Sequence, residues 1–188
     1  IEDARDWIII GCVEPHGGRG ATDGSPVGGY VSGPKCLEMV LHNGVDPVTG
    51  KKLGLETGDP LTFTCKEDLV EAVKKQIINA WTLLTREHCI TQSIQKNVPA
   101  VYASSLIDGC IEKGMSIQEG GPVHCFVNTF ICGAATVADS IAAIDYAVFQ
   151  KHILTMEEII HLCDTNFEGA EDLRQMLVNR APKFGNDN

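Results

Sequence analysis

The sequence has no long apolar run. The longest runs, such as Trp7-Ile8-Ile9-Ile10, are far shorter than the roughly 20 apolar residues that a membrane-spanning helix needs. We therefore expect no membrane partner. Hydrophobic residues make up 44% and charged residues 21% of the 188 residues, which is typical of a globular domain with a core of its own.

Basic residues are scarce. The chain has 15 Lys and Arg against 25 Asp and Glu, which gives a net charge of -10. Binding to phosphate backbones requires a positively charged surface, so this balance argues against a nucleic-acid partner.

Metal and disulfide signatures are missing, although cysteine is frequent. No pair forms C-x-x-C, and no Cys/His cluster has zinc spacing. We therefore expect no metal site, and free thiols in a reducing, oxygen-poor cytoplasm. Cys36 and Cys163 lie on apolar faces of predicted helices, where a free cysteine acts as a small hydrophobe. Cys125 and Cys132 are also predicted to be core residues rather than ligands.

Signatures of nucleotide binding and of serine hydrolases are also missing. The glycine-rich loop after residue 16 lacks the Lys of a P-loop, and the dinucleotide-binding fingerprint and G-x-S-x-G are not found. A nucleotide ligand is therefore disfavoured.

A buried strand is predicted over residues 6–12, because Trp7 and three isoleucines form a continuous apolar run. Cys12 follows the carboxyl end of this strand, where α/β folds tend to place their chemistry. A long loop with seven glycines is predicted from Val13 to about Pro34. A helix from Pro34 to Asn43 then ends at Gly44.

Further helices and one strand follow, so the fold class is α/β. Residues 46–60 are rich in turns. Thr64 and Glu67 form a capping box for a helix whose predicted apolar stripe consists of Val70, Val73, Ile77, Trp81 and Leu84. A strand is predicted over residues 123–131, a helix from Thr136, a helix from a Thr155/Glu158 capping box to about Cys163, and a last helix over residues 169–179.

The motif Gly11-Cys12-Val13-Glu14-Pro15 is the sharpest local feature. A thiol and a carboxylate two residues apart can lie close together in a bent backbone, with Glu14 placed to move protons for a substrate that Cys12 attacks. On these residues alone, a strand end with one core cysteine and one exposed glutamate is the better interpretation. His16 and His124 could contact substrate, although each is more often an ordinary histidine.

Several motifs in the same order resemble one family. The Cys12 motif is similar to the cysteine loop of glycyl radical enzymes of the pyruvate formate-lyase superfamily, in its dehydratase and decarboxylase branch. Further similar stretches are residues 30–35, 37–38, 43–52, 57–60, 104–110, 120–121, 138–144 and 181–187.

The resemblance implies a segment of a ten-stranded α/β barrel around the cysteine loop. In this family a glycyl radical elsewhere in the protein takes hydrogen from the cysteine thiol, and the thiyl radical then abstracts hydrogen from substrate. By matching position, Cys12 would be the thiyl residue and Glu14 the general base, while His124 would stand where the family has an aromatic residue that lines the substrate pocket. His16 is a substrate-binding candidate because it lies close to the Cys12/Glu14 pair in the sequence. The implied partners are a small-molecule substrate, an iron–sulfur activase using S-adenosylmethionine, the remaining segments and, at full length, further copies of the enzyme. This segment would itself bind no cofactor.

Two departures from the family shape the expectation. The radical-bearing motif R-V-x-G-[YF] does not occur in residues 1–188, and the chain begins at Ile1 rather than Met. We therefore expect one incomplete barrel segment, without the radical-bearing domain. The stretch 21–25 also differs from the Gly-Trp-His-Asp pattern of the glycerol and choline lyases, so we do not expect glycerol or choline as the substrate. A dehydratase-like radical lyase is the main hypothesis. An arylacetate-type decarboxylase and a non-catalytic split subunit are the alternatives.

Overall fold

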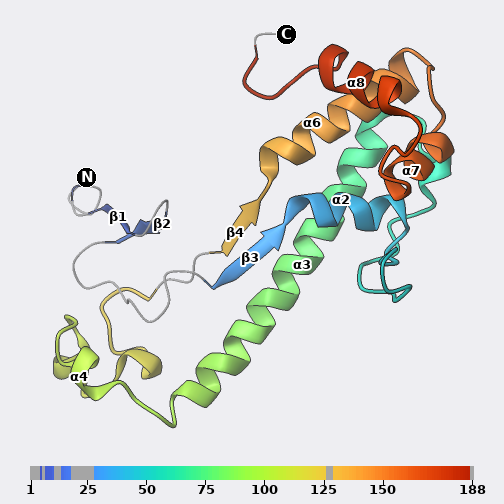
Figure 1. Cartoon of the computed structure of the whole chain (residues 1–188). Helices are drawn as coiled ribbons and strands as arrows, with labels where there is room; N and C mark the ends of the chain where they lie inside the picture. The colour runs from blue at the N-terminus through green and yellow to red at the C-terminus, as the bar shows by residue number, and fades with distance from the viewer. Residues whose placement is uncertain (1–4, 6, 11–13, 18–27, 126–128, 187–188) are drawn as a thin grey trace. The chain divides into compact units, whose positions relative to one another are not determined.

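The computed structural model describes residues 5, 7–10, 14–17, 28–125 and 129–186. The chain divides into two compact units. The first comprises Ile1–Tyr30 and Trp81–Phe130, and the second comprises Val31–Ala80 and Ile131–Asn188. Figure 1 shows the elements of each unit.

The first unit contains a short hairpin and several short helices. β1 (Ile8–Ile10) pairs with β2 (Glu14–His16) in antiparallel orientation. The helical segments are the second half of α3 (Lys66–Gln95), then α4 (Val101–Ser104), α5 (Cys110–Lys113) and the 3-10 turn η2 (Ile117–Glu119).

The strand predicted at residues 6–12 is confirmed over Ile8–Ile10, but its predicted burial is wrong. Trp7 is 59%, Ile8 47% and Ile9 67% exposed. The apolar run predicted a strand inside a larger sheet, with other elements packed on both of its faces. Among the described strands, β1 pairs only with β2.

The second unit is built from strand–helix pairs. β3 (Gly29–Ser32) begins in the first unit and leads directly into α2 (Gly33–Leu41), and β4 (Thr129–Cys132) leads into α6 (Ala134–Ile144) in the same way. The two strands are neighbours in a sheet and run in the same direction (Figure 1). The unit is completed by the 3-10 turn η1 (Pro60–Thr62), the π-helical turn η3 (Asp145–Gln150), α7 (Met156–Asp164) and α8 (Glu171–Arg180).

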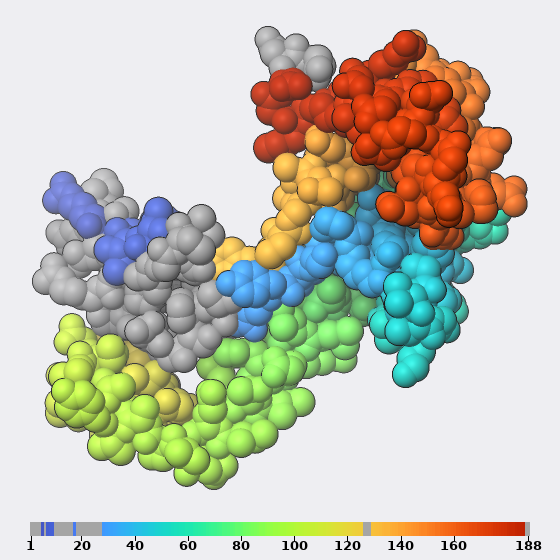
Figure 2. Space-filling model, in the orientation of Figure 1, coloured from blue at the N-terminus to red at the C-terminus, as the bar shows by residue number. Residues whose placement is uncertain are grey.

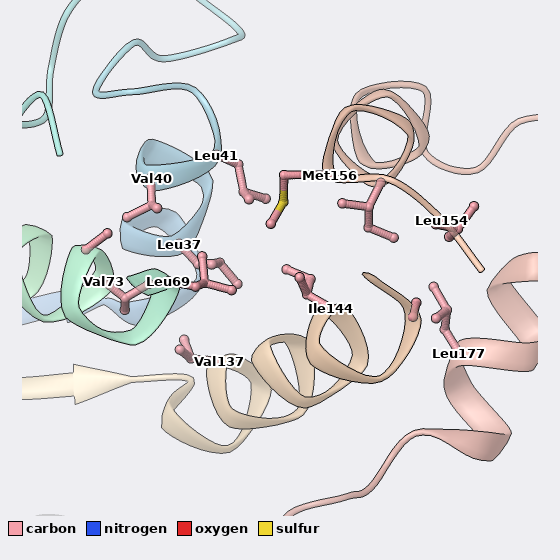
Figure 3. Packing of buried hydrophobic residues seen from close by; sticks show 13 residues of the cluster. Leu37, Val40, Leu41, Leu69, Val73, Val137, Ile144, Leu154, Met156 and Leu177 are labelled. Atoms are coloured by element: carbon pink, nitrogen blue, oxygen red, sulfur yellow. The ribbon is translucent and has the colours of Figure 1, made fainter. Parts of the chain in front are cut away.

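The core of the second unit lies between these helices. Figure 3 shows Leu37 and Val40 of α2 facing Leu69 of α3 and Val137 of α6, with Met156 closing the cluster from α7. In the space-filling view, α7 and α8 pack with the end of α6 as one body (Figure 2). Burial of these side chains at about 25 cal/mol per Å² is the main force that holds the helices together.

Helix starts match the capping predictions in part. The Thr155/Glu158 box is confirmed: Thr155 Oγ1 accepts from Glu158 N–H at 3.2 Å, and Glu158 Oε2 accepts from Thr155 N–H at 2.7 Å. In α3 (Lys66–Gln95) the predicted partner Glu67 is wrong, because Asp68 Oδ2 accepts from Thr64 N–H at 2.9 Å. One residue further along the helix, Asp68 reaches back over Thr64.

Other boundaries also shift. The predicted 13–34 loop contains β2 and β3, and helix α2 starts at Gly33, capped by Ser32. α6 begins at Ala134, two residues before the predicted Thr136, because Gly133 supplies the left-handed cap with φ 75°. The strand predicted at 123–131 is found only at its end, as β4, with residues 126–128 outside the described range.

The cysteines are less buried than their sequence context predicted. Cys36 and Cys110 are buried, whereas Cys125, Cys132 and Cys163 are exposed. Cys163 does follow Met156 and Ile159 on the apolar face of α7, but it lies beyond the part of that face that the core covers. All seven described cysteines are free thiols.

Candidate active site

The hairpin of the first unit carries the predicted acid/base residue. Its register pairs Ile10 with Glu14, Ile9 with Pro15 and Ile8 with His16. Cys12 lies outside the described residues, and for Glu14 and His16 the structure describes the backbone only. The sequence 11–13 links the two paired residues, so Glu14 is the first residue of the strand that follows the cysteine.

His124, the other predicted substrate contact, belongs to the same unit. It is exposed, and its backbone forms an isolated β-bridge. The turn before it is firmly held: Val123 N–H donates to the Asp108 carbonyl at 3.1 Å, and Lys113 Nζ donates to the Pro122 carbonyl at 2.7 Å. His124 thus follows a backbone segment that these two hydrogen bonds hold in place.

Gly121 explains why this turn needs glycine. A Cβ atom there would lie 2.2 Å from the Met115 carbonyl oxygen and 2.8 Å from Cys110 Sγ. The first of these neighbours is backbone and cannot move aside easily. The turn can therefore approach α5 closely only because residue 121 has no side chain.

A separate cavity of about 450 Å³ lies in the second unit, between α2, α6, α7 and α8. Its polar rim includes His42, whose Nε2 lies 2.9 Å from Asp164 Oδ1 and whose Nδ1 lies 2.9 Å from the Glu38 carbonyl oxygen. Sequence reasoning missed this pair, because 122 positions separate the two residues and no local motif marks them.

The cysteine beside this pair is not an activated nucleophile. Although the residue as a whole is exposed, its sulfur is partly withdrawn from solvent beside the cavity, and this desolvation, together with the neighbouring Asp164 carboxylate, raises the pKa of the Cys163 thiol. Burial also raises the pKa of Cys36 and of Cys110. Attack by an ionic mechanism requires the thiolate, so these three thiols are poorly suited to it.

Metal ligands do not gather anywhere in the described part of the chain, where no group of three His, Cys, Asp or Glu side chains could hold an ion. Of the described helices, none is both long and apolar enough to cross a bilayer.

The chain has relatives over its whole length. It is 38% identical to trans-4-hydroxy-L-proline dehydratase of Clostridioides difficile over 188 residues, which is all of this chain and 24% of that protein. The crystal structure of hydroxyproline dehydratase from the same organism, with substrate bound, matches with a TM-score of 0.88 at 35% identity, again over 100% of this chain and 24% of the other. A glycyl radical enzyme from Archaeoglobus fulgidus matches with a TM-score of 0.86 at 30% identity, over 99% of this chain and 23% of the other.

A relative named as a decarboxylase is less similar in sequence. The glycyl radical subunit of 4-hydroxyphenylacetate decarboxylase from Clostridioides difficile is 27% identical over 188 residues, covering 89% of this chain and 20% of that protein. The chain thus spans about a quarter of the length of the curated relatives it matches.

The structural matches confirm the predicted α/β class and the glycyl radical enzyme type of barrel to which this segment corresponds. The family model described as pyruvate formate lyase-like matches residues 1–188, which is the entire chain. The chain therefore belongs to the pyruvate formate lyase-like family.

Proposed function

We propose that this chain is the cysteine-loop segment of a glycyl radical lyase that eliminates water, or another small leaving group, from a small polar organic substrate. The observation that carries the proposal is the 38% identity to a hydroxyproline dehydratase across the full chain. The more distant decarboxylase relative makes elimination the first choice of reaction.

Cys12 and Glu14 have different roles in the proposed mechanism. The sulfur of Cys12 carries the unpaired electron and removes a hydrogen atom from substrate. Glu14 moves a proton on the substrate radical, so that the leaving group departs. The antiparallel hairpin supports this assignment, since it fixes the backbone of Glu14 against Ile10 directly after the cysteine segment.

His16 and His124 are proposed to contact substrate. His16 ends the strand that Glu14 begins, and His124 follows the turn packed on α5. Both residues belong to the same compact unit as the cysteine loop. An imidazole can either donate or accept a hydrogen bond, which suits a small polar substrate.

The remaining parts of the machinery are proposed to lie outside residues 1–188. These residues would form one segment of the barrel domain, with the radical-bearing domain supplied by other segments of the enzyme. The glycyl radical would take the hydrogen atom from the Cys12 thiol at the start of the reaction. An iron–sulfur activase using S-adenosylmethionine would generate this glycyl radical. The proposal includes an anaerobic cytoplasmic setting and a homo-oligomeric full-length enzyme.

Two alternatives make different predictions. An arylacetate-type decarboxylase would use the same Cys/Glu pair, and the decarboxylase relative favours it as second candidate. A non-catalytic split subunit would fold with partner segments and release no product.

The experiment that separates these possibilities combines the chain with the remaining segments of the enzyme and its activase under anaerobic conditions. Hydroxyproline and a hydroxyphenylacetate are then supplied in parallel. Loss of water from a hydroxylated substrate supports the proposal, and release of carbon dioxide from the arylacetate supports the first alternative. A glycyl radical signal without turnover of either substrate would favour the non-catalytic subunit.

A further inference from the structure

Helix α3 belongs to both compact units. It runs unbroken from Lys66 to Gln95 (Figure 1), and the boundary between the units falls after Ala80. The buried residues of the helix all lie in its first half, and they are Leu69, Ala72, Val73 and Gln76. The three apolar ones among them belong to the hydrophobic core of the second unit. One face of the helix is therefore covered in that unit.

The same face continues into the second half of the helix. Its residues recur at alternating intervals of four and three, and they are Leu69, Val73, Gln76, Ala80, Leu83, Glu87, Ile90 and Ile94. Seven residues bring an α-helix back to the same side to within about 20°, so these positions form one line along α3. This is the spacing by which a helix packs along another amphipathic element.

The second half of this line is uncovered. Leu83 is 51%, Ile90 62% and Ile94 62% exposed, whereas Leu69 is 0% exposed. We call the positions Leu83, Glu87, Ile90 and Ile94 the open face of α3. An apolar surface of this kind usually marks a site of interaction.

The contacts that this half of α3 makes within the chain lie on another side of the helix. Leu84 is half-buried, and its Cδ1 stands 2.6 Å from where a Cβ atom of Gly29 would be. One residue along an α-helix turns the side chain by about 100°, so Leu84 and Leu83 point in different directions. The open face is thus a second apolar side of the helix, separate from the one that packs on the chain itself.

The first unit also has no share in the hydrophobic core. All the buried residues of that cluster lie in the second unit. The described residues of the first unit include several large apolar side chains that are exposed by two thirds or more, namely Val98, Val101, Tyr102, Leu106 and Ile111. The surface around the open face is therefore apolar as well.

The relatives indicate what covers the open face. Trans-4-hydroxy-L-proline dehydratase matches this chain along its whole length, yet the chain covers only 24% of that protein. About three quarters of such an enzyme lies outside the matched part. The continuity of the open face with the buried line of Leu69 and Val73 favours a further core-like contact over an open surface.

A second copy of this chain fits the open face poorly. A two-fold contact places the same patch on both partners. Parallel helices would then set the two Glu87 carboxylates opposite each other, and antiparallel helices centred on the open face would set them within one turn. Each copy also carries a net charge of -10, so the two surfaces would repel each other.

Glu87 adds a requirement on the partner. Its Oε1 accepts a hydrogen bond from Thr91 Oγ1 at 2.9 Å. A hydroxyl donor does not neutralise a carboxylate, and a carboxylate that is covered by a partner must be paired with a cation. The segment that covers the open face must therefore bring a Lys or Arg to Glu87.

We propose that the open face of α3 is the docking surface for an amphipathic segment of the same enzyme from outside residues 1–188, which packs apolar side chains on Leu83, Ile90 and Ile94 and pairs a Lys or Arg with Glu87. This inference rests on the proposed function in one respect, namely that the chain is part of a longer enzyme.

The test uses the complete enzyme and a photoreactive residue. Leu83, and separately Ile94, is replaced with a diazirine amino acid of about the size of leucine, and the irradiated protein is mapped by mass spectrometry of peptides. Both positions should become joined to one segment outside residues 1–188 that contains a Lys or Arg. Gln92 is the matched control, because it is exposed on the side of α3 opposite Leu83, and it should not label that segment. Links between the α3 helices of two copies would overturn the proposal, as would the absence of any product at both positions.

A charge placed on the open face gives a second readout. Ile90→Glu should lower the melting temperature of the complete enzyme by several degrees, whereas Gln92→Glu, which places the same charge on another side of the helix, should leave it nearly unchanged. Equal melting temperatures for the two variants would contradict the proposal. Neither measurement requires turnover. An enzyme that forms the cross-link but converts no substrate would refute the proposed function alone, and turnover without the cross-link would refute this inference alone.

Discussion

Gln76 binds both backbone groups of Leu55. Its Oε1 accepts from Leu55 N–H at 3.1 Å, and its Nε2 donates to the Leu55 carbonyl at 2.6 Å. Gln76 is only 2% exposed, so these two bonds satisfy a polar side chain inside the core of the second unit. They join α3 to the turn-rich segment that follows α2.

Replacing Gln76 with Ala should therefore destabilise the chain more than an exposed substitution on the same helix. The Leu55 amide and carbonyl would lose their partners, a change that typically destabilises by about 1–3 kcal/mol for each unsatisfied buried group. Urea unfolding followed by circular dichroism measures the difference. Gln92→Ala, at an exposed position of α3, is the control and should change the free energy of unfolding by less than about 0.5 kcal/mol. Equal effects would show that the Leu55 contacts contribute nothing.

Gly44 and Gly50 offer a matched comparison in the same segment. Both have positive φ, 87° and 68°. A Cβ at Gly44 would lie 2.5 Å from the Leu55 carbonyl oxygen, whereas nothing lies within 4 Å of one at Gly50. Gly50→Ala should therefore destabilise by roughly 1–2 kcal/mol through backbone strain alone. Gly44→Ala should destabilise by more, because a backbone clash adds to the strain. The same unfolding measurement ranks the two variants, and the reverse order would contradict the clash.

The ion pair and hydrogen bonds of Asp46 should make the stability of the folded chain sensitive to acid. The Lys35 ammonium and Thr49, whose N–H donates to Asp46 Oδ2 at 3.0 Å, lower the pKa of the Asp46 carboxyl to about 2. A lowered folded-state pKa means that this contribution to stability is fully present above pH of about 4 and is lost as the pH falls through about 2. A carboxyl carbon titration by NMR should show a midpoint near 2 for Asp46. Asp46→Asn should weaken the acid dependence of unfolding, while Glu56→Gln, at an exposed ion pair, should leave it unchanged. A midpoint near 4 would refute the prediction.

The sequence predicts those elements whose signals are local. The capping box at Thr155 was correctly placed, since it depends on residues within one turn. The end predicted at Gly44 for the helix from Pro34 to Asn43 was wrong by two residues, because α2 ends at Leu41 and Asn43 already has a positive φ of 47°. The family was also predictable, because many short motifs occur in the right order.

Contacts between distant segments were not predictable. The apolar stripe predicted for α3 included Trp81, which is 51% exposed, while the buried face includes Leu69 and Gln76. Gln76 is buried because it binds the backbone of Leu55, and the apolar periodicity of the helix cannot predict that contact. Similarly, Phe184 N–H donates to Asp139 Oδ1 at 2.6 Å, which joins two motifs that lie 45 positions apart.

The proposed mechanism predicts that Cys12→Ser abolishes turnover in the complete, activated enzyme. Sulfur carries the unpaired electron in the proposed cycle, and a serine oxygen cannot replace it. The glycyl radical should still form and be visible by electron paramagnetic resonance, while hydrogen exchange into substrate should stop. Cys65→Ser is the control, because Cys65 precedes α3 in the other compact unit and should leave turnover measurable. Substantial turnover by Cys12→Ser would refute the thiyl assignment.

Glu14→Gln should separate the two steps that Cys12→Ser removes together. Abstraction of hydrogen needs only the thiyl radical, so this variant should still form the glycyl radical and exchange substrate hydrogen. Elimination needs a proton moved on the substrate radical, a role typically worth about 10²–10⁴-fold in rate, and product formation should fall by that amount. Glutamine keeps the size of the side chain but cannot transfer the proton, so a loss of product without a loss of exchange would point to acid/base chemistry rather than to misfolding. If Glu14→Gln were fully active, Cys12 could still be the thiyl residue, but the acid/base role would pass to another group, with His16 as the next to replace.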